Sequence, residues 1–198
     1  MTQSIDLREF DLFAFCRSGD TADGEVALRE LPRILAETAA QAPASAPDER
    51  FRFQVHGMAR EEAGEPGRAP VRRLFLDLSV EGSVWLNCQR CLEAYAEPVS
   101  TATRFEVVAT EEEADAAPMD DDEVDVIAGS KRFSLLTLIE DEVLLALPVA
   151  PKHAVCESVH ESLVTGADGQ VEPEVEATPE EEKRPSPFAA LANLKTKH

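Results

Sequence analysis

Alternation of hydrophobic and polar residues dominates the middle of the chain and predicts β-strands there. The alternation is clear over residues 51–57, 74–80, 84–88 and 95–107, and a period of two residues places every second side chain on the same face of a strand. The sequence Glu81-Gly82-Ser83 separates two of these runs, which predicts a β-hairpin with a tight turn. The last three runs are therefore expected to form an antiparallel meander, with residues 51–57 as a candidate fourth strand.

Spacings of three and four residues predict a first helix between Glu25 and Ala40. The hydrophobic residues of this segment share one helical face, and Pro32 indicates that the helix proper begins near it, because proline fits the first helical turn. Before the helix, residues 18–24 contain Gly, Ser and Asp, which predicts a turn. Residues 4–16 are expected to form a short helix or strand that packs on the core.

A second helix is predicted over residues 135–147. Ser134 is a suitable N-cap, and Pro148 ends the helix because the residue before a proline disfavours the α conformation. Residues 140–142 are the acidic run Glu-Asp-Glu. Consecutive helical positions diverge by about 100°, so we interpret this run as a solvent-exposed face rather than as paired catalytic carboxylates.

These elements together predict an α+β fold: an antiparallel β-sheet meander with two packed helices, plus a disordered acidic loop and a disordered C-terminal tail. The expected folded domain covers residues 1–156 and contains the acidic loop at residues 109–123. Residues 157–182 are expected to form a disordered acidic tail, and residues 183–198 a short amphipathic C-terminal anchor.

The negative charge of the chain is concentrated in two segments. The formal charge is −20, with 39 Asp and Glu residues against 19 Lys and Arg residues. Residues 111–125 and residues 157–182 each contain nine acidic residues and no Lys or Arg, and such segments bury too little apolar surface to offset the entropy lost on ordering. A chain of this charge does not bind RNA through general neutralisation of phosphates, so any RNA contact is expected to be local.

The C-terminal end differs in composition from the acidic segment before it. Phe188, Leu191 and Leu194 recur at intervals of three residues, which places them on one face of a short helix. Lys and Arg residues flank this face. We therefore predict a cationic amphipathic anchor that docks either on its own domain or on a partner.

The sequence predicts neither export nor insertion into a membrane. The N-terminus lacks the basic region and hydrophobic run of a signal peptide, and no stretch of about 18 consecutive apolar residues is present. We therefore expect a cytoplasmic protein, in which the four cysteines are thiols or metal ligands rather than disulfides.

Two pairs of candidate metal ligands share the same spacing. Cys88 and Cys91 are separated by two residues at the end of a predicted strand, and His153 and Cys156 by two residues after the second predicted helix. One tight turn can supply two ligands at this spacing, and a Cys3His set suits structural zinc. Two other interpretations stay open. The cysteines are inert thiols, with Cys88 packed inward, Cys91 at the turn and Cys156 at the start of the tail, or they serve redox chemistry or transient metal binding. Cys16 is expected to be a small buried hydrophobe.

Three motifs in series resemble those of the bacterial YceD family. They are Cys88-Gln89-Arg90-Cys91-Leu92-Glu93, then Glu140 to Pro148 followed by Pro151 and His153, and finally Pro187 to Lys195. The segment from Gly24 to Arg33 also resembles the early segment of that family. The resemblance implies a role in the accumulation, processing or stability of large-subunit ribosomal RNA, without enzymatic activity. It does not imply a complete zinc site.

The leading hypothesis is therefore a non-enzymatic ribosome-biogenesis factor that contacts large-subunit ribosomal RNA, a pre-ribosomal particle or a basic ribosomal protein. The alternative is a zinc- or thiol-based redox-responsive interaction protein. The chain has no Gly-rich phosphate loop, nucleophile elbow or His/Asp/Glu cluster, so an enzyme is not expected. The candidate contact residues are four arginines and the anchor side chains: Arg52, Arg72, Arg73, Arg90, Phe188, Leu191 and Leu194.

Overall fold

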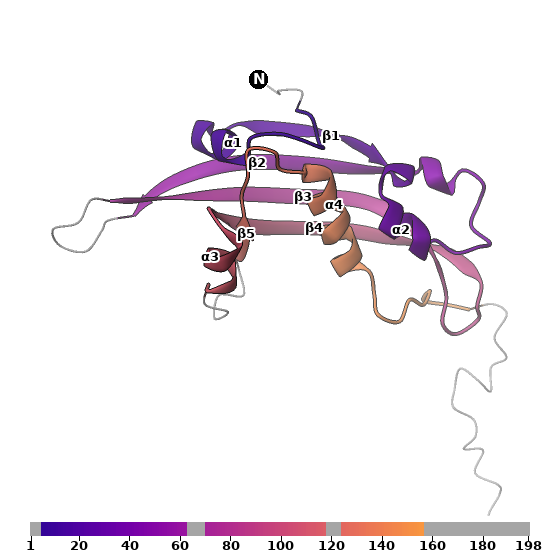
Figure 1. Ribbon diagram of the computed structural model, residues 1–198. Coiled ribbons are helices and arrows are strands. Elements are labelled where there is room, and N and C mark those ends of the chain that lie inside the picture. The colour runs from indigo at the N-terminus through magenta and orange to yellow at the C-terminus, as the bar shows by residue number, and fades with distance from the viewer. Residues whose placement is uncertain (1–4, 63–69, 118–123, 157–198) are drawn as a thin grey trace, which may run out of the picture. The chain divides into compact units, whose positions relative to one another are not determined.

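Five strands in the described part of the chain form one mixed sheet (Figure 1). The structure is a computed structural model and describes residues 5–62, 70–117 and 124–156. The strands from β1 to β4 pair antiparallel with their neighbours, whereas β5 is parallel to β4. The predicted α+β class is confirmed. In order across the sheet, the strands are β1 (Thr21–Ala27), β2 (Arg50–Glu62), β3 (Val71–Asn87), β4 (Ala94–Val108) and β5 (Asp125–Ala128).

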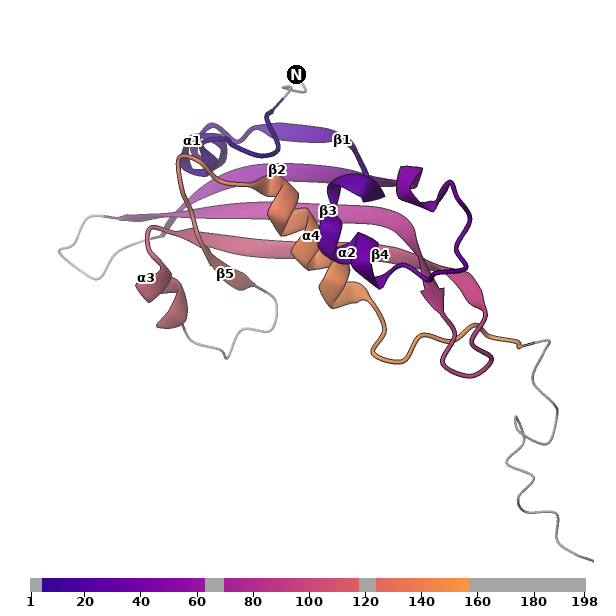
Figure 2. The same ribbon diagram turned by 45° about the vertical axis from the view of Figure 1, so that its right-hand side comes forward.

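The helices described beside this sheet are short, apart from the last. Figures 1 and 2 show α2 and α4 on the same face of the sheet, with α4 crossing the central strands obliquely. As predicted, α2 begins at Pro32, and Ser134 caps α4 by accepting a hydrogen bond from the backbone N of Thr137 at 3.2 Å. No helix in the described ranges is long and apolar enough to cross a membrane. The helices are α1 (Leu12–Ser18), α2 (Pro32–Glu37), α3 (Glu111–Asp115) and α4 (Leu135–Ala146), with 3-10 turns at Leu28–Glu30 and Ala46–Asp48.

One face of the sheet forms the floor of the hydrophobic core. Alternate residues of the strands are buried beneath the helices, as the period of two predicts. The strand side chains meet an apolar face of α4 that includes Ile139 and Val143, both fully buried. The opposite face of the sheet carries mainly polar and charged side chains. The buried strand residues include Phe51, Phe53 and Val55 of β2, and Leu76, Leu78 and Val80 of β3.

The third strand is continuous where the sequence predicts a hairpin. Residues 81–83 pair with β4, and Gly82 lies opposite Val99. The ring of Phe51 packs against Gly82 so closely that a Cβ atom at position 82 would collide with it. Gly82 therefore makes room for an aromatic ring rather than for a turn, and the predicted turn is wrong.

The segment before α2 also differs from the prediction. Gly19 ends α1 with a φ of 71°, but the residues after it extend into β1, in which Gly24 lies opposite Phe53. The helix proper begins at Pro32, as predicted, but residues 25–27, which share the helical spacing, belong to β1. The reason is again a glycine beneath an aromatic ring, because the Phe53 ring lies over Gly24.

Part of the predicted acidic loop is helical. Thr110 caps α3 by accepting a hydrogen bond from the backbone N of Glu113 at 3.2 Å. Three glutamates occupy the first turn of α3, where negative side chains interact favourably with the positive end of the helix dipole. Residues 118–123 lie outside the described residues, as do the predicted tail and the predicted anchor with Phe188, Leu191 and Leu194, so those predictions stay untested.

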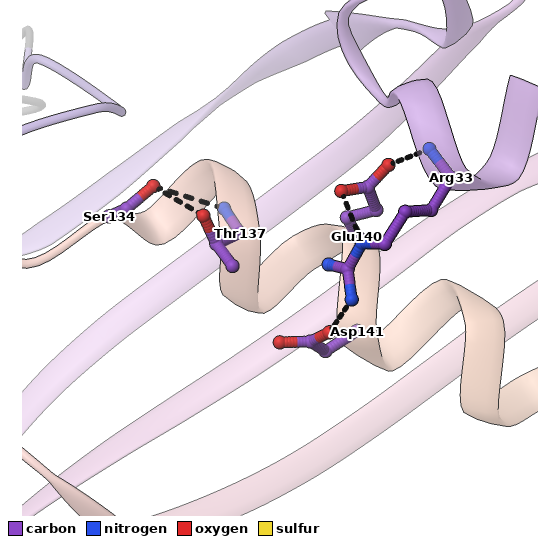
Figure 3. Close-up of polar contacts among 5 residues, drawn as sticks. All are labelled: Arg33, Ser134, Thr137, Glu140 and Asp141. Atoms are coloured by element: carbon purple, nitrogen blue, oxygen red, sulfur yellow. Dashed lines mark hydrogen bonds and ion pairs between the residues drawn. The ribbon is translucent and has the colours of Figure 1, made fainter.

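Two acidic residues of α4 are buried, although the sequence predicted an outward-facing acidic run. Glu140 and Glu142 are each 6% exposed. Arg33 donates from its backbone N and from Nε to the two carboxylate oxygens of Glu140, at 2.6 and 2.9 Å, and from Nη1 to Asp141 at 2.6 Å (Figure 3). The hydroxyl of Thr103 donates to Glu142. Because buried charges need partners, these contacts hold α2 and β4 against α4.

Gly57 of β2 allows α1 to pack directly on the sheet. A Cβ atom at position 57 would lie 2.7 Å from the carbonyl oxygen of Phe15 and 2.8 Å from the Cα of Cys16. These are backbone atoms, so relief requires movement of α1. We expect Gly57→Ala to lower the free energy of unfolding by about 1–3 kcal/mol, as measured by urea denaturation.

Gly24→Ala provides the control for this substitution. A Cβ atom there would lie 3.0 Å from atoms of the Phe53 ring, which can shift slightly because they belong to a side chain. The loss of stability is expected to be smaller than at Gly57. A Gly57→Ala protein as stable as the wild type would contradict this description of the packing.

Candidate functional site

The loop between β3 and β4 presents the first pair of cysteines. Its turn is closed by two backbone hydrogen bonds, from Cys88 N to Glu93 O at 2.9 Å and from Leu92 N to Cys88 O at 2.8 Å. Leu92, which follows Cys91, has a φ of 65°. This left-handed conformation costs a non-glycine residue about 1–2 kcal/mol, and strain of this kind is concentrated at functional sites.

The segment after α4 delivers the second pair of ligands. The helix ends at Ala146, and the chain then runs toward the β3–β4 loop. There the backbone N of Gln89 donates a hydrogen bond to the carbonyl oxygen of Pro151 at 2.8 Å. This contact aligns the two segments, and His153 and Cys156 follow within five residues.

The two pairs form one compact cluster, here called the Cys/His cluster: Cys88, Cys91, His153 and Cys156. Their ligand atoms all lie within 4.8 Å of one another. The Sγ atoms of Cys88 and Cys156 are 3.7 Å apart, and Cys91 Sγ is 3.5 Å from His153 Nε2. Tetrahedral zinc, with Zn–S bonds of about 2.3 Å and Zn–N bonds of about 2.0 Å, separates its ligands by about 3.5–3.8 Å. The donor set and these spacings therefore suit zinc.

Cys88 differs from Cys16, the cysteine outside the cluster, in its electrostatic surroundings. Burial by itself raises the pKa of the Cys88 thiol, but N–H groups of Cys91, Arg90 and His153 point toward it and bring its pKa down to about 6. Burial raises the pKa of the Cys91 thiol. Cys16 is fully buried in α1, and this burial raises its pKa to about 12. Cysteine binds metals as the thiolate, and the lower pKa of Cys88 means that its thiol ionises more readily than that of Cys16.

Cys156 belongs to the packed domain. It is 8% exposed, although one interpretation of the sequence placed it at the start of a free tail. Its Sγ atom is held between Cys88 and the guanidinium of Arg90. The sequence shows the spacing of the pair but not this burial, because the residues around Cys156 carry no regular hydrophobic pattern.

Tyr95 of β4 is a further residue of the site that sequence reasoning did not identify. Its ring centroid lies 5.2 Å from that of His153, with the two rings tilted by 36°. Burial, together with the neighbouring Glu97 carboxylate, raises the pKa of Tyr95 to about 12. The ring supports the imidazole of a candidate ligand. The signal that identifies it is the strand register, which places Tyr95 opposite Leu86, two residues before Cys88.

Two of the predicted contact arginines are engaged with acidic residues on the sheet. Arg73 pairs with Glu106 and Glu62, and these carboxylates raise its pKa. The Nε atom of Arg52 lies 3.9 Å from Oε1 of Glu25. A phosphate that approached either arginine would compete with a carboxylate already in place.

The other two predicted contact arginines lie at opposite ends of β3. Arg72, near the start of the strand, donates a hydrogen bond to the carbonyl oxygen of Arg17 at 3.2 Å. Arg90, beyond the end, turns onto the Cys/His cluster. The strand has 17 residues, which corresponds to roughly 50 Å. The structure therefore does not bring the four arginines together into one basic surface.

The family model that matches this chain includes the Cys/His cluster and α4 in its matched region. A family model described as "Large ribosomal RNA subunit accumulation protein YceD" matches residues 76–195. The chain is similar to the Large ribosomal RNA subunit accumulation protein YceD of Haemophilus influenzae, with 34% identity over 131 residues, 65% of this chain and 69% of that relative. No solved structure matches the chain. Because the family model matches more than half of the residues, this chain belongs to the YceD family.

Proposed function

We propose that this protein is a non-enzymatic factor that supports the accumulation of large-subunit ribosomal RNA. The observation that carries the proposal is the family match over residues 76–195, together with the name of the H. influenzae relative. The matched region includes the Cys/His cluster and α4. The parts of the domain that build the candidate site are therefore the parts that the family model describes.

The proposal includes a structural zinc ion held by the Cys/His cluster. Structural zinc sites have four protein ligands, whereas catalytic sites keep one position for water or substrate. The cluster offers four ligand atoms within 4.8 Å of one another. Zinc would supply a cross-link between the β3–β4 loop and the segment after α4, which agrees with a role in binding rather than in catalysis.

The proposed contact is with a basic protein of the large subunit or of its precursor. The chain carries a charge of −20, and its candidate arginines are engaged with acidic groups, a backbone carbonyl or a thiol. These features favour the binding of a cationic protein surface over the neutralisation of phosphates. The acidic residues would shield the basic partner until it meets its ribosomal RNA.

A redox response is the second candidate function, favoured by the lowered pKa of Cys88 and the 3.7 Å separation of Cys88 and Cys156 Sγ. An added oxidant such as diamide would take two electrons and two protons from this thiol pair and leave a disulfide. A protein that acts in this way must change its binding partners after oxidation. An unchanged set of partners would remove this candidate.

Crosslinking in cells tests the proposed contact. The full-length protein is purified after formaldehyde treatment, and the attached proteins and RNA are identified. We expect basic proteins of the large subunit to be recovered, with little RNA attached after ultraviolet irradiation, which joins only groups in direct contact. Strong ultraviolet crosslinks to large-subunit RNA would indicate direct RNA contact instead. Recovery of neither component would contradict the proposed function.

A further inference from the structure

We propose that Arg90 is the positioning residue of the zinc site: it balances the charge of the cluster and joins its two halves. This inference rests on the proposed zinc ion and deepens it. The sequence suggested that Arg90 is presented to RNA or to a partner. The structure turns the side chain the other way, because its Nε lies 2.9 Å from Cys156 Sγ.

Arg90 offsets the net charge of the proposed zinc site. Three thiolates and one neutral imidazole around Zn²⁺ leave a net charge of −1. The guanidinium of Arg90 supplies one positive charge, and its Nε lies 2.9 Å from Sγ of Cys156, a proposed ligand atom. A cation at this distance from a ligand sulfur offsets the net negative charge of the proposed zinc site by Coulomb attraction.

Arg90 also contacts both segments that supply the ligands. Arg90 belongs to the β3–β4 loop, and its backbone N donates to Cys88 Sγ at 3.4 Å. Its Nη2 donates to the carbonyl oxygens of His153 and Ala154, at 3.1 and 3.4 Å. The side chain of Arg90 therefore contacts three of the four residues from His153 to Cys156. The planar guanidinium has several N–H donors in a fixed fork, so it can donate to the sulfur and to the carbonyl groups at the same time. The ammonium group of a lysine is a compact charge and fits such an arrangement less well.

The test measures the zinc affinity of the full-length protein by competition with a chromogenic chelator. We expect Arg90→Ala to weaken zinc binding by about 10- to 100-fold, the usual effect of losing a group that supports metal ligands. Arg90→Gln should behave like Arg90→Ala. Arg90→Lys should recover part of the affinity, because it restores the charge but not the fork of donors.

The control is Arg72→Ala. Arg72 also donates from its guanidinium to a backbone carbonyl, that of Arg17, but it lies at the other end of β3, so zinc affinity should not change. The visible spectrum of the cobalt-substituted protein reports the number of thiolate ligands. It should be the same in the wild type and in Arg90→Lys, as expected for a residue that acts from outside the ligand set.

The outcomes separate this inference from the zinc proposal. A wild-type protein that holds no zinc would overturn the zinc proposal itself. A wild-type protein with one zinc per chain, and an Arg90→Ala protein of equal affinity, would overturn only the role of Arg90. Equal affinities for Arg90→Lys and Arg90→Ala, both weaker than the wild type, would overturn the charge-balancing part of that role.

Discussion

Replacement of Cys88 by serine is expected to abolish stoichiometric zinc binding. Cys88 is fully buried, and its sulfur lies 3.7 Å from that of Cys156. A serine hydroxyl does not ionise near neutral pH and cannot replace a thiolate ligand. Metal analysis of the purified protein should find about one zinc per wild-type chain and close to none in Cys88→Ser after dialysis against a weak chelator.

The same substitution should remove the stabilisation that zinc provides. A ligand that binds only the folded state stabilises it by about 4 kcal/mol when its free concentration is 1,000 times its Kd. A strong chelator should therefore lower the melting temperature of the wild type, yet leave that of Cys88→Ser unchanged.

Cys16→Ala is the matched control for the zinc experiment. Cys16 is equally buried but lies in α1, outside the Cys/His cluster. This variant should lose some stability through the small cavity and still bind one zinc. A metal-free wild type, or a Cys88→Ser protein with the zinc content and chelator response of the wild type, would contradict the assignment.

Replacement of Arg33 by methionine is expected to lower the free energy of unfolding by about 2–4 kcal/mol. The variant leaves the buried carboxylate of Glu140 without its guanidinium partner (Figure 3). The expected loss of stability is smaller than the largest losses seen when a fully buried ion pair is broken, because the Arg33 side chain is 48% exposed. The backbone N of residue 33 also continues to donate to Glu140, as it does at 2.6 Å in the wild type.

Arg29→Met is the matched control for the Arg33 substitution, and both variants are compared by urea denaturation. Arg29 pairs with Asp48, and the two side chains are 59% and 63% exposed. Exposed ion pairs contribute at most about 1 kcal/mol. Similar losses in the two variants would show that the contact between Arg33 and Glu140 does not anchor α2 to α4.

Much of the fold could be predicted because the spacing of hydrophobic residues depends only on nearby positions in the sequence. The helix after Ser134 and the alternating strands follow directly from it. The continuous β3 and the strand β1 could not be predicted in this way. Both depend on a glycine that makes room for an aromatic ring from a neighbouring strand, Gly82 beneath Phe51 and Gly24 beneath Phe53, and sequence alone does not distinguish such a glycine from a turn residue.

The candidate site was predictable in its ligands but not in its surroundings. The spacing of Cys88 and Cys91, repeated by His153 and Cys156, identified the four residues that the structure brings together. The inward orientation of Arg90 depends on contacts with a segment more than 60 residues later in the chain. The burial of Glu140 likewise depends on Arg33, which lies over 100 residues earlier.

The ratio of large- to small-subunit ribosomal RNA shows whether the protein supports the accumulation of large-subunit ribosomal RNA. This ratio is measured in cells from which the gene has been deleted and in the same cells after the wild-type gene is returned. We predict a lower ratio after deletion and recovery with the wild-type gene. An unchanged ratio in the deletion cells would contradict the proposed function.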